Sequence, residues 1–146
     1  MVERTVEIDA SPESVWELLT NPAEANRWMG LSAEFDLRPG GAYRVEVLSG
    51  SVARGEFVEI DPPHRLVYTF GWEGGVSEVP PGSSTVEFEL IPNGGGTIVQ
   101  FRHYDLPTPD SVARHGHGWD HYLGRLAVAA AGGDPGVDPW LAGPIE

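Results

Sequence analysis

Three histidines and an aspartate lie within seven residues of one another in the segment RHGHGWDHYLGR, residues 114 to 125. Histidine can ligate a metal, act as a general acid or base near neutral pH, or serve as a hydrogen-bonding group in a core. Its role here depends on where each side chain points along the secondary structure that this segment adopts. The surrounding residues predict a long helix.

That helix is predicted from the cap at Thr108 and the first-turn proline at Pro109 to the glycines at 132 and 133. On a wheel of about 100° per residue, one face carries most of the apolar side chains. This face comprises Val112, His115, Trp119, Tyr122, Leu123, Leu126 and Ala130. The opposite face carries Arg114, His117, His121, Arg125 and Val128. His115 is therefore expected to point at the interior, and His117 and His121 to face solvent.

The spacing of His117 and His121, four residues apart, is one that can hold a metal. The glutamate that follows the first histidine in the zinc-protease motif is absent here. Two arginines share the same face. We interpret this face as solvated, and we expect no metal and no other cofactor.

His115 and His103 have two interpretations. His103 lies on the apolar face of the last predicted strand, residues 97 to 106. Either histidine is a core residue with its hydrogen bonds satisfied, or a polar group in a cavity that binds a ligand or transfers a proton. Both are candidate catalytic residues under the second interpretation.

The elements that must position these residues are mostly strands. Residues 2–8 alternate in polarity, and residues 33–37, 42–48, 51–60, 64–72, 84–92 and 97–106 form further strands separated by Gly/Pro turns. Two short helices, at 11–20 and 21–29, each begin with a capping residue followed by proline. The pattern predicts an α+β fold with an antiparallel sheet.

The amino-acid composition disfavours or excludes several classes of partner and site. Nine Lys and Arg against 22 Asp and Glu give a net charge of −13, which disfavours nucleic acid as a partner. Without cysteine the chain has no disulfide, thiol nucleophile or Cys-ligated zinc. No apolar run approaches the ~20 residues of a membrane span, and the start does not read as a signal peptide. We expect a cytoplasmic protein with one domain at 1–133 and an irregular tail at 134–146, in which Trp140 could dock onto a neighbour.

Five segments resemble a known family: VEIDASPESVWELLTNPAEANRWM, FDLRPGGAYRVEV, GEFVEIDPPHRLVYTFGW, STVEFELIPNGGGTIVQFRH and GWDHYLGRL. Together they are similar to the helix-grip fold of the Bet v 1-like/START (SRPBCC) superfamily. Within it they resemble the family related to the activator of the ninety-kilodalton heat-shock chaperone's ATPase. The resemblance covers nearly all of residues 2–131. It implies a curved seven-stranded antiparallel sheet gripping the long C-terminal helix, with a cavity between them.

Members of that superfamily use the cavity for lipids, sterols, hormones and polyketides, and a minority carry out cyclisation or dehydration there. The aromatic side chains on the inward faces agree with a cavity, although they could equally fill a solid core. We expect the cavity to be lined by Trp28, Tyr68, Phe70, Trp72, Phe88, Phe101, His103, His115, Trp119, Tyr122 and Leu123.

Three functions follow from these observations. The favoured one is binding of a small hydrophobic or amphipathic molecule in the cavity. The second is a polyketide-cyclase-type enzyme that works without metal through His103 and His115. The third is a partner-binding protein, either a homodimer or a cofactor of a chaperone, in which an acidic surface meets a basic partner.

Overall fold

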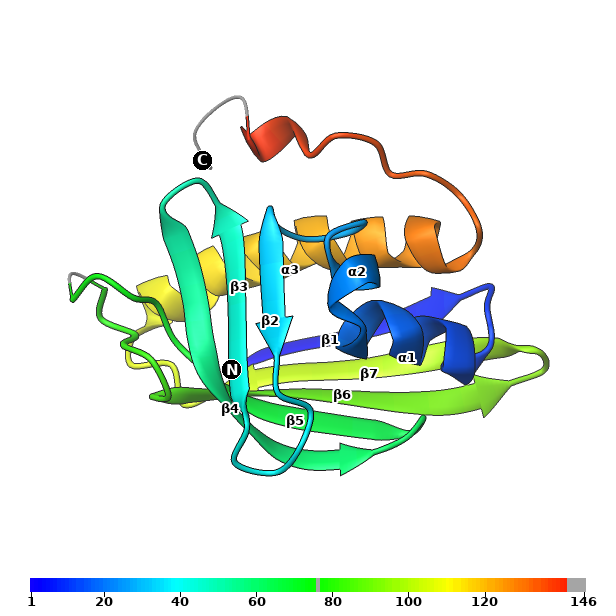
Figure 1. Ribbon diagram of the computed structural model, residues 1–146, viewed down its shortest axis with the longest axis horizontal. Coiled ribbons are helices and arrows are strands. Elements are labelled where there is room, and N and C mark those ends of the chain that lie inside the picture. Colours follow the sequence, from blue (N-terminus) through cyan, green and yellow to red (C-terminus); the bar gives the residue numbers. More distant parts are fainter. Residues whose placement is uncertain (76, 142–146) are drawn as a thin grey trace.

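One curved sheet and one long helix make up most of the fold (Figure 1). The computed structural model describes residues 1–75 and 77–141. The strands are β1 (Val2–Ile8), β2 (Ser32–Phe35), β3 (Ala42–Leu48), β4 (Ser51–Asp61), β5 (Arg65–Phe70), β6 (Ser84–Asn93) and β7 (Gly96–Tyr104). The helices are α1 (Pro12–Thr20), α2 (Pro22–Ala25), α3 (Pro109–Ala130) and the short 3₁₀ helix η1 (Pro139–Leu141).

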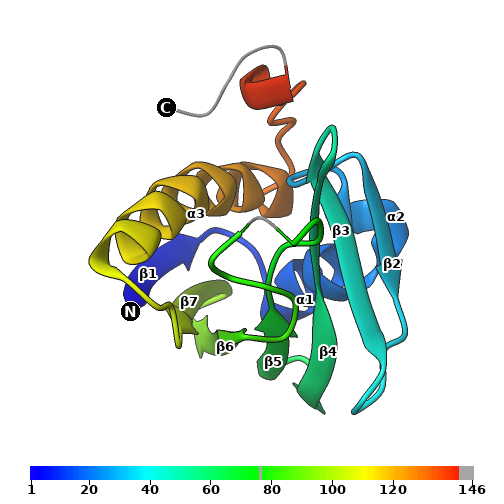
Figure 2. The ribbon, with the colours of Figure 1, turned by 90° about the vertical axis from the view of Figure 1, so that its left-hand side faces the viewer.

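All neighbouring strands are antiparallel, in the order β1-β7-β6-β5-β4-β3-β2. The segment with α1 and α2 therefore connects the two edge strands, β1 and β2. Figure 2 shows α3 lying across the concave side of the curved sheet. The expected α+β helix-grip fold, with seven antiparallel strands and two short helices after the first strand, is confirmed.

Two glycines, Gly55 in β4 and Gly71 just after β5, allow close approaches of the backbone. A Cβ atom on Gly55 of β4 would overlap the carbonyl of Thr69, and one on Gly71 would overlap the carbonyl of Pro80. Only glycine lets the backbones come this near. The register between β4 and β5 also shifts between Phe57 and Glu59, a bulge that bends the strand.

The caps of the helices are those expected from the sequence. Ser11, Asn21 and Thr108 each accept a hydrogen bond from a backbone N–H in the first turn. The second helix is shorter than expected, since α2 ends at Ala25 and not at residue 29. Beyond Ala25 the chain continues in hydrogen-bonded turns. There the Asn26 amide donates to the Met29 carbonyl, and the Trp28 indole donates to the Leu18 carbonyl of α1.

The two faces of the sheet differ in polarity. The concave face, toward α3, is apolar, and its cross-strand pair Phe88 and Phe101 has ring centroids 5.1 Å apart. The convex face carries charges, among them Glu87 between Arg65 and Arg102. None of the helices in residues 1–75 and 77–141 is both long and apolar enough to cross a bilayer.

Candidate functional site: a cavity beneath the C-terminal helix

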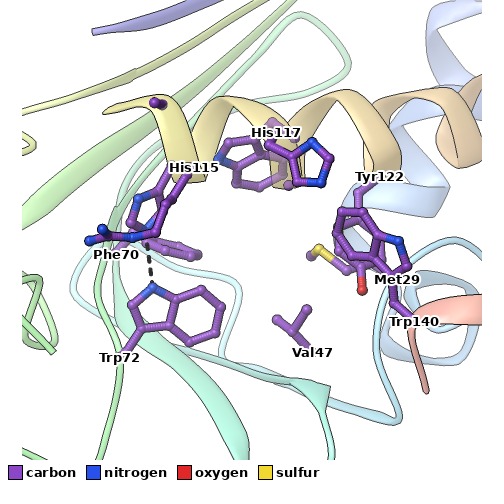
Figure 3. Close-up of a pocket in the computed structure, with 12 residues that line it drawn as sticks. Met29, Val47, Phe70, Trp72, His115, His117, Tyr122 and Trp140 are labelled. Atoms are coloured by element: carbon purple, nitrogen blue, oxygen red, sulfur yellow. Dashed lines mark hydrogen bonds between the residues drawn. The ribbon is translucent and has the colours of Figure 1, made fainter. Parts of the chain in front are cut away.

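A cavity of about 680 Å³ lies between α3 and the concave face of the sheet (Figure 3). Its deep part, which we call the floor, is formed by Met29, Val47, Phe70, Trp119 and Tyr122, each no more than 6% exposed. Its outer part, which we call the rim, is formed by Ala113, Arg114 and His117 of α3. Trp72, His115, Gly118 and Trp140 complete the lining.

Five of the residues expected to line the cavity do so: Phe70, Trp72, His115, Trp119 and Tyr122. They come from the end of β5, the residues just after it, and one face of α3. In Figure 3, Trp72 and Trp140 lie on opposite sides of the open space, with His115, His117 and Tyr122 descending from α3. The predicted inward direction of His115 agrees with its contact to Trp72.

The other six expected residues lie in the packed core and are not part of this cavity's lining: Trp28, Tyr68, Phe88, Phe101, His103 and Leu123. Each is at most 3% exposed. Tyr68 stacks on Tyr43 with ring centroids 4.1 Å apart, and Phe101 packs against Trp119 at 4.5 Å. Trp28 turns toward α1, where its indole N–H donates to the Leu18 carbonyl at 2.8 Å.

Seven lining residues are not among the eleven named from the sequence: Met29, Val47, Ala113, Arg114, His117, Gly118 and Trp140. The alternation of Tyr43, Val45 and Val47 marks the inner face of β3, and this signal could have identified Val47. The expectation that His117 belongs to a solvated face is corrected in part, because its ring is exposed but also lines the rim and stacks on Trp140 at 5.2 Å. Nothing in the tail's sequence indicated that Trp140 would return to α3.

His115 has hydrogen bonds at both ring nitrogens. Its Nδ1–H donates to the Ser111 carbonyl at 2.7 Å, and its Nε2 accepts from the Trp72 indole at 3.0 Å (dashed in Figure 3). Burial lowers the pKa of His115, although the bond to Ser111 opposes this shift. The imidazole is therefore neutral at pH 7 and has no lone pair or proton left for a substrate.

His103 is fully buried and equally engaged. Its Nδ1 accepts from the Trp119 indole at 3.0 Å, and its Nε2–H donates to the Ser84 hydroxyl at 2.8 Å. Ser84 in turn donates to the Phe70 carbonyl at 2.8 Å. Burial, and next the neighbouring His115, lower the pKa of His103 to about 3. The geometry is that of a structural histidine, and a general base would need one of these bonds to break first.

The C-terminal tail closes the cavity on the side of Trp140. The Trp140 ring stacks on His121 at 3.8 Å and meets Tyr122 edge-on at 5.7 Å. Asp138 accepts hydrogen bonds from the Tyr122 hydroxyl at 2.7 Å and from His121 Nε2–H at 2.8 Å. His121 is therefore half-buried, and the expectation that it faces solvent is wrong: the tail, which a helical wheel does not include, covers it.

The tail's anchoring has electrostatic consequences. Burial alone would raise the pKa of Asp138, but the bonds from Tyr122, the Trp140 N–H and His121 lower it on balance. Arg125 adds three bonds to backbone carbonyls, to Trp28 near α2 and to Pro135 and Gly136 in the tail. With Nε2 of His121 directed at Asp138, the histidine pair is not arranged around a common point. Over the residues that the structure describes, no three His, Asp or Glu side chains gather as a metal site would require.

Comparison with known proteins gives a consistent result. Residues 9–131 match the family described as Activator of Hsp90 ATPase homolog 1-like protein. A search of curated proteins found no match. The chain is similar to the solution structure of an AHSA1-like protein from Rhizobium etli, at 49% identity and TM-score 0.76, over 99% of this chain and 90% of that one.

Two further solved structures show the same fold at lower identity. CalU16 from Micromonospora echinospora is 28% identical with a TM-score of 0.72, over 88% of this chain and 74% of that one. An HSP90 activator from Plasmodium falciparum is also 28% identical with a TM-score of 0.72, over 87% of this chain and 93% of that one.

Proposed function

The chain belongs to the family of Activator of Hsp90 ATPase homolog 1-like proteins, and on this premise we propose that it binds a small hydrophobic or amphipathic molecule in the cavity under α3. The observation that carries the proposal is the cavity itself. Its volume of about 680 Å³ falls within the roughly 300–1,000 Å³ typical of ligand pockets. Its floor is apolar, and binding there would remove apolar ligand surface from water.

The hydrogen bonding of the walls also supports binding over catalysis. Trp72 and Trp119 direct their indole N–H groups to histidines, so these polar atoms are already satisfied. No buried side-chain N or O atom in residues 1–75 and 77–141 lacks a partner. The lining therefore offers a ligand apolar contacts, and the indole N–H groups of Trp72 and Trp119 need no hydrogen-bond partner from the ligand. A cyclase-type enzyme would need a free acid or base, and neither His103 nor His115 has an available nitrogen.

A role with a chaperone rests on a different observation, the relationship to a Plasmodium protein named as an HSP90 activator. Its test is independent of the cavity. Purified protein is added to an Hsp90 and the ATPase rate is measured. A rate that rises with added protein supports this role, and an unchanged rate at saturating protein contradicts it.

The binding proposal is tested with a pair of glycine substitutions on α3. A Cβ on Gly118 or on Gly124 meets no atom within 4 Å, so a side chain can begin at either position without a clash. Gly118 lines the cavity, whereas Gly124 is exposed elsewhere on the helix. Both changes should stabilise α3 by up to about 1 kcal/mol because glycine is a poor helix former. Only Gly118→Leu places a side chain in the cavity.

The measurement is fluorescence titration with N-phenyl-1-naphthylamine, an uncharged apolar probe. The natural protein and Gly124→Leu should bind the probe with similar affinity, and Gly118→Leu should bind it at least about tenfold more weakly, since the added leucine takes up space that the probe needs. Native mass spectrometry of protein purified from cells then looks for a bound molecule that Gly118→Leu lacks. Equal probe binding by both variants would show that the probe site lies elsewhere and would refute the proposal.

A further inference from the structure

Resting on the proposed binding function, we propose that the ligand is an amphipathic acid, with its apolar body on the floor and its carboxylate at the rim beside Arg114 and His117. The inference starts from the charges of the lining. Of the twelve lining residues Arg114 is the one Lys or Arg, and none is Asp or Glu. The chain as a whole carries 22 acidic and 9 basic residues. The lining thus lacks the acidic side chains that dominate the rest of the protein.

The exposed basic side chains at the rim lie apart from the buried apolar floor. A ligand could therefore place its polar head at the rim and its apolar body on the floor. The floor residues Phe70, Trp119 and Tyr122 are at most 4% exposed, whereas the Arg114 side chain is 64% exposed. Arg114 and His117 are three residues apart on α3, so their side chains neighbour each other on the helix surface. A molecule whose apolar part fills the floor has its polar end next to these two side chains.

Arg114 already forms an ion pair with a carboxylate, that of Glu78, and this contact shows the geometry in which a carboxylate binds at the rim. Its Nη2 donates to Oε1 of Glu78 at 2.7 Å, and the Thr108 hydroxyl donates to the same oxygen at 3.0 Å. A guanidinium has five N–H donors in a planar fork that suits carboxylates. Among the described residues, no hydrogen bond from Nε or Nη1 of Arg114 is seen, so a ligand carboxylate can bind beside Glu78 or replace it.

The aromatic rings of the lining, in contrast, favour a ligand with a positively charged head. Trp and Tyr faces attract cations, ammonium groups above all. However, a cation at the rim would meet the guanidinium of Arg114 directly. A carboxylate to neutralise a buried cation is also missing from the twelve lining residues. Glu78 offsets the charge of Arg114, so the preference for an acid rests on the guanidinium donors that Glu78 leaves open.

The experiment uses three molecules with the same alkyl chain and different heads: dodecanoate, dodecan-1-ol and dodecyltrimethylammonium. Each is titrated against bound N-phenyl-1-naphthylamine near pH 7, at low salt and below its micelle concentration. Dodecanoate should displace the probe at a concentration roughly three- to tenfold lower than the alcohol, because a partly exposed charge-assisted hydrogen bond is worth about this factor. The ammonium compound should be the weakest.

Three variants locate the effect. Arg114→Gln should remove the advantage of dodecanoate over the alcohol. Arg38→Gln is the matched control, since Arg38 is also exposed and paired with a carboxylate, Asp36 at 2.9 Å, but does not line the cavity. It changes the net charge equally and should keep the advantage. Glu78→Gln frees the guanidinium and should strengthen dodecanoate binding.

The outcomes separate this inference from the proposed function. If neither the probe nor any of the three molecules binds, the binding function itself fails. If the alcohol and the acid bind equally well, or if Arg114→Gln and Arg38→Gln behave alike, hydrophobic binding stands and the acidic head is refuted. Tightest binding by the ammonium compound would likewise overturn the acid and assign the head site to a cation. Unchanged or weaker dodecanoate binding by Glu78→Gln would contradict the role given to Arg114.

Discussion

Replacing His103 by glutamine is expected to make folding less sensitive to acid. In the folded chain both nitrogens of His103 are occupied by Trp119 and Ser84, so the ring stays neutral. Burial, and next His115, lower its pKa from 6.5 to about 3. Below pH 6.5 the unfolded chain binds a proton at this residue that the folded chain does not. The stability contributed by neutral His103 is therefore present above pH 6.5 and is lost as the pH falls toward 3.

The size of the effect follows from this difference in pKa. Each pH unit within the window removes at most about 1.4 kcal/mol of the free energy of unfolding. Between pH 7 and pH 4 the loss due to His103 amounts to about 3 kcal/mol, which is a large fraction of the 5–15 kcal/mol typical of a domain. Glutamine has one acceptor and two donors and does not titrate. His103→Gln should therefore lower stability by about 1–3 kcal/mol at pH 7 through imperfect bonds, but lose about 3 kcal/mol less on acidification.

The assay is urea unfolding at pH 7, 5.5 and 4, followed by circular dichroism. His64→Gln is the control, since His64 is exposed and its change should leave the acid dependence of the natural protein in place. Ring ¹⁵N chemical shifts of His103 at pH 4 should still report a neutral imidazole with the proton on Nε2. If the natural protein and His103→Gln lose equal stability between pH 7 and pH 4, the neutral, doubly bonded His103 described here is incorrect.

Three further predictions test the tail and the sheet. Asp138→Asn should lower the free energy of unfolding by about 1–3 kcal/mol and increase cleavage of the tail in limited proteolysis, because the buried bonds from Tyr122 and His121 weaken; equal cleavage with and without the change would argue against the anchor. Trp140→Ala removes one side of the cavity and should speed the dissociation of N-phenyl-1-naphthylamine in stopped-flow measurements, an effect that should be absent if the tail does not border the occupied space. Gly55→Ala should prevent folding or cost more than about 3 kcal/mol because its Cβ meets the Thr69 carbonyl, whereas Gly124→Ala should stabilise by about 1 kcal/mol; a soluble, stable Gly55→Ala protein would contradict the close approach of β4 and β5.

Local signals in the sequence were sufficient for the elements and their order. Alternation along residues 84–92 and 97–106 places Phe88 and Phe101 on the concave face, and the structure pairs these two residues directly. Thr108 and Pro109 begin α3 as predicted, because capping depends on residues next to each other in the chain. The curvature of the sheet is harder to predict from the sequence, since a glycine such as Gly55 is equally typical of a turn.

The cavity lining was harder to predict, for a physical reason. Periodicity tells which side chains face inward but not whether a neighbour fills the space in front of them. Trp119 and Phe88 both face the interior, and only Trp119 reaches the open volume. The tail is the second difficulty. Trp140 and Asp138 lie beyond the periodic pattern of α3, so neither their return to the helix nor the burial of His121 has a local signal.

The two interior histidines explain how such a volume can remain open. Apolar side chains around an empty space lose dispersion contacts, and a core tends to relax into the gap. Here Trp72 and Trp119 cannot turn inward without breaking an indole bond to His115 or His103 and leaving buried polar atoms unsatisfied, at a cost of about 1–3 kcal/mol each. Each histidine is in turn fixed by its second nitrogen, to Ser111 or Ser84. The side chains that looked most suited to catalysis therefore have a different use: as neutral acceptors they hold the rings of Trp72 and Trp119 in place in the lining of the cavity.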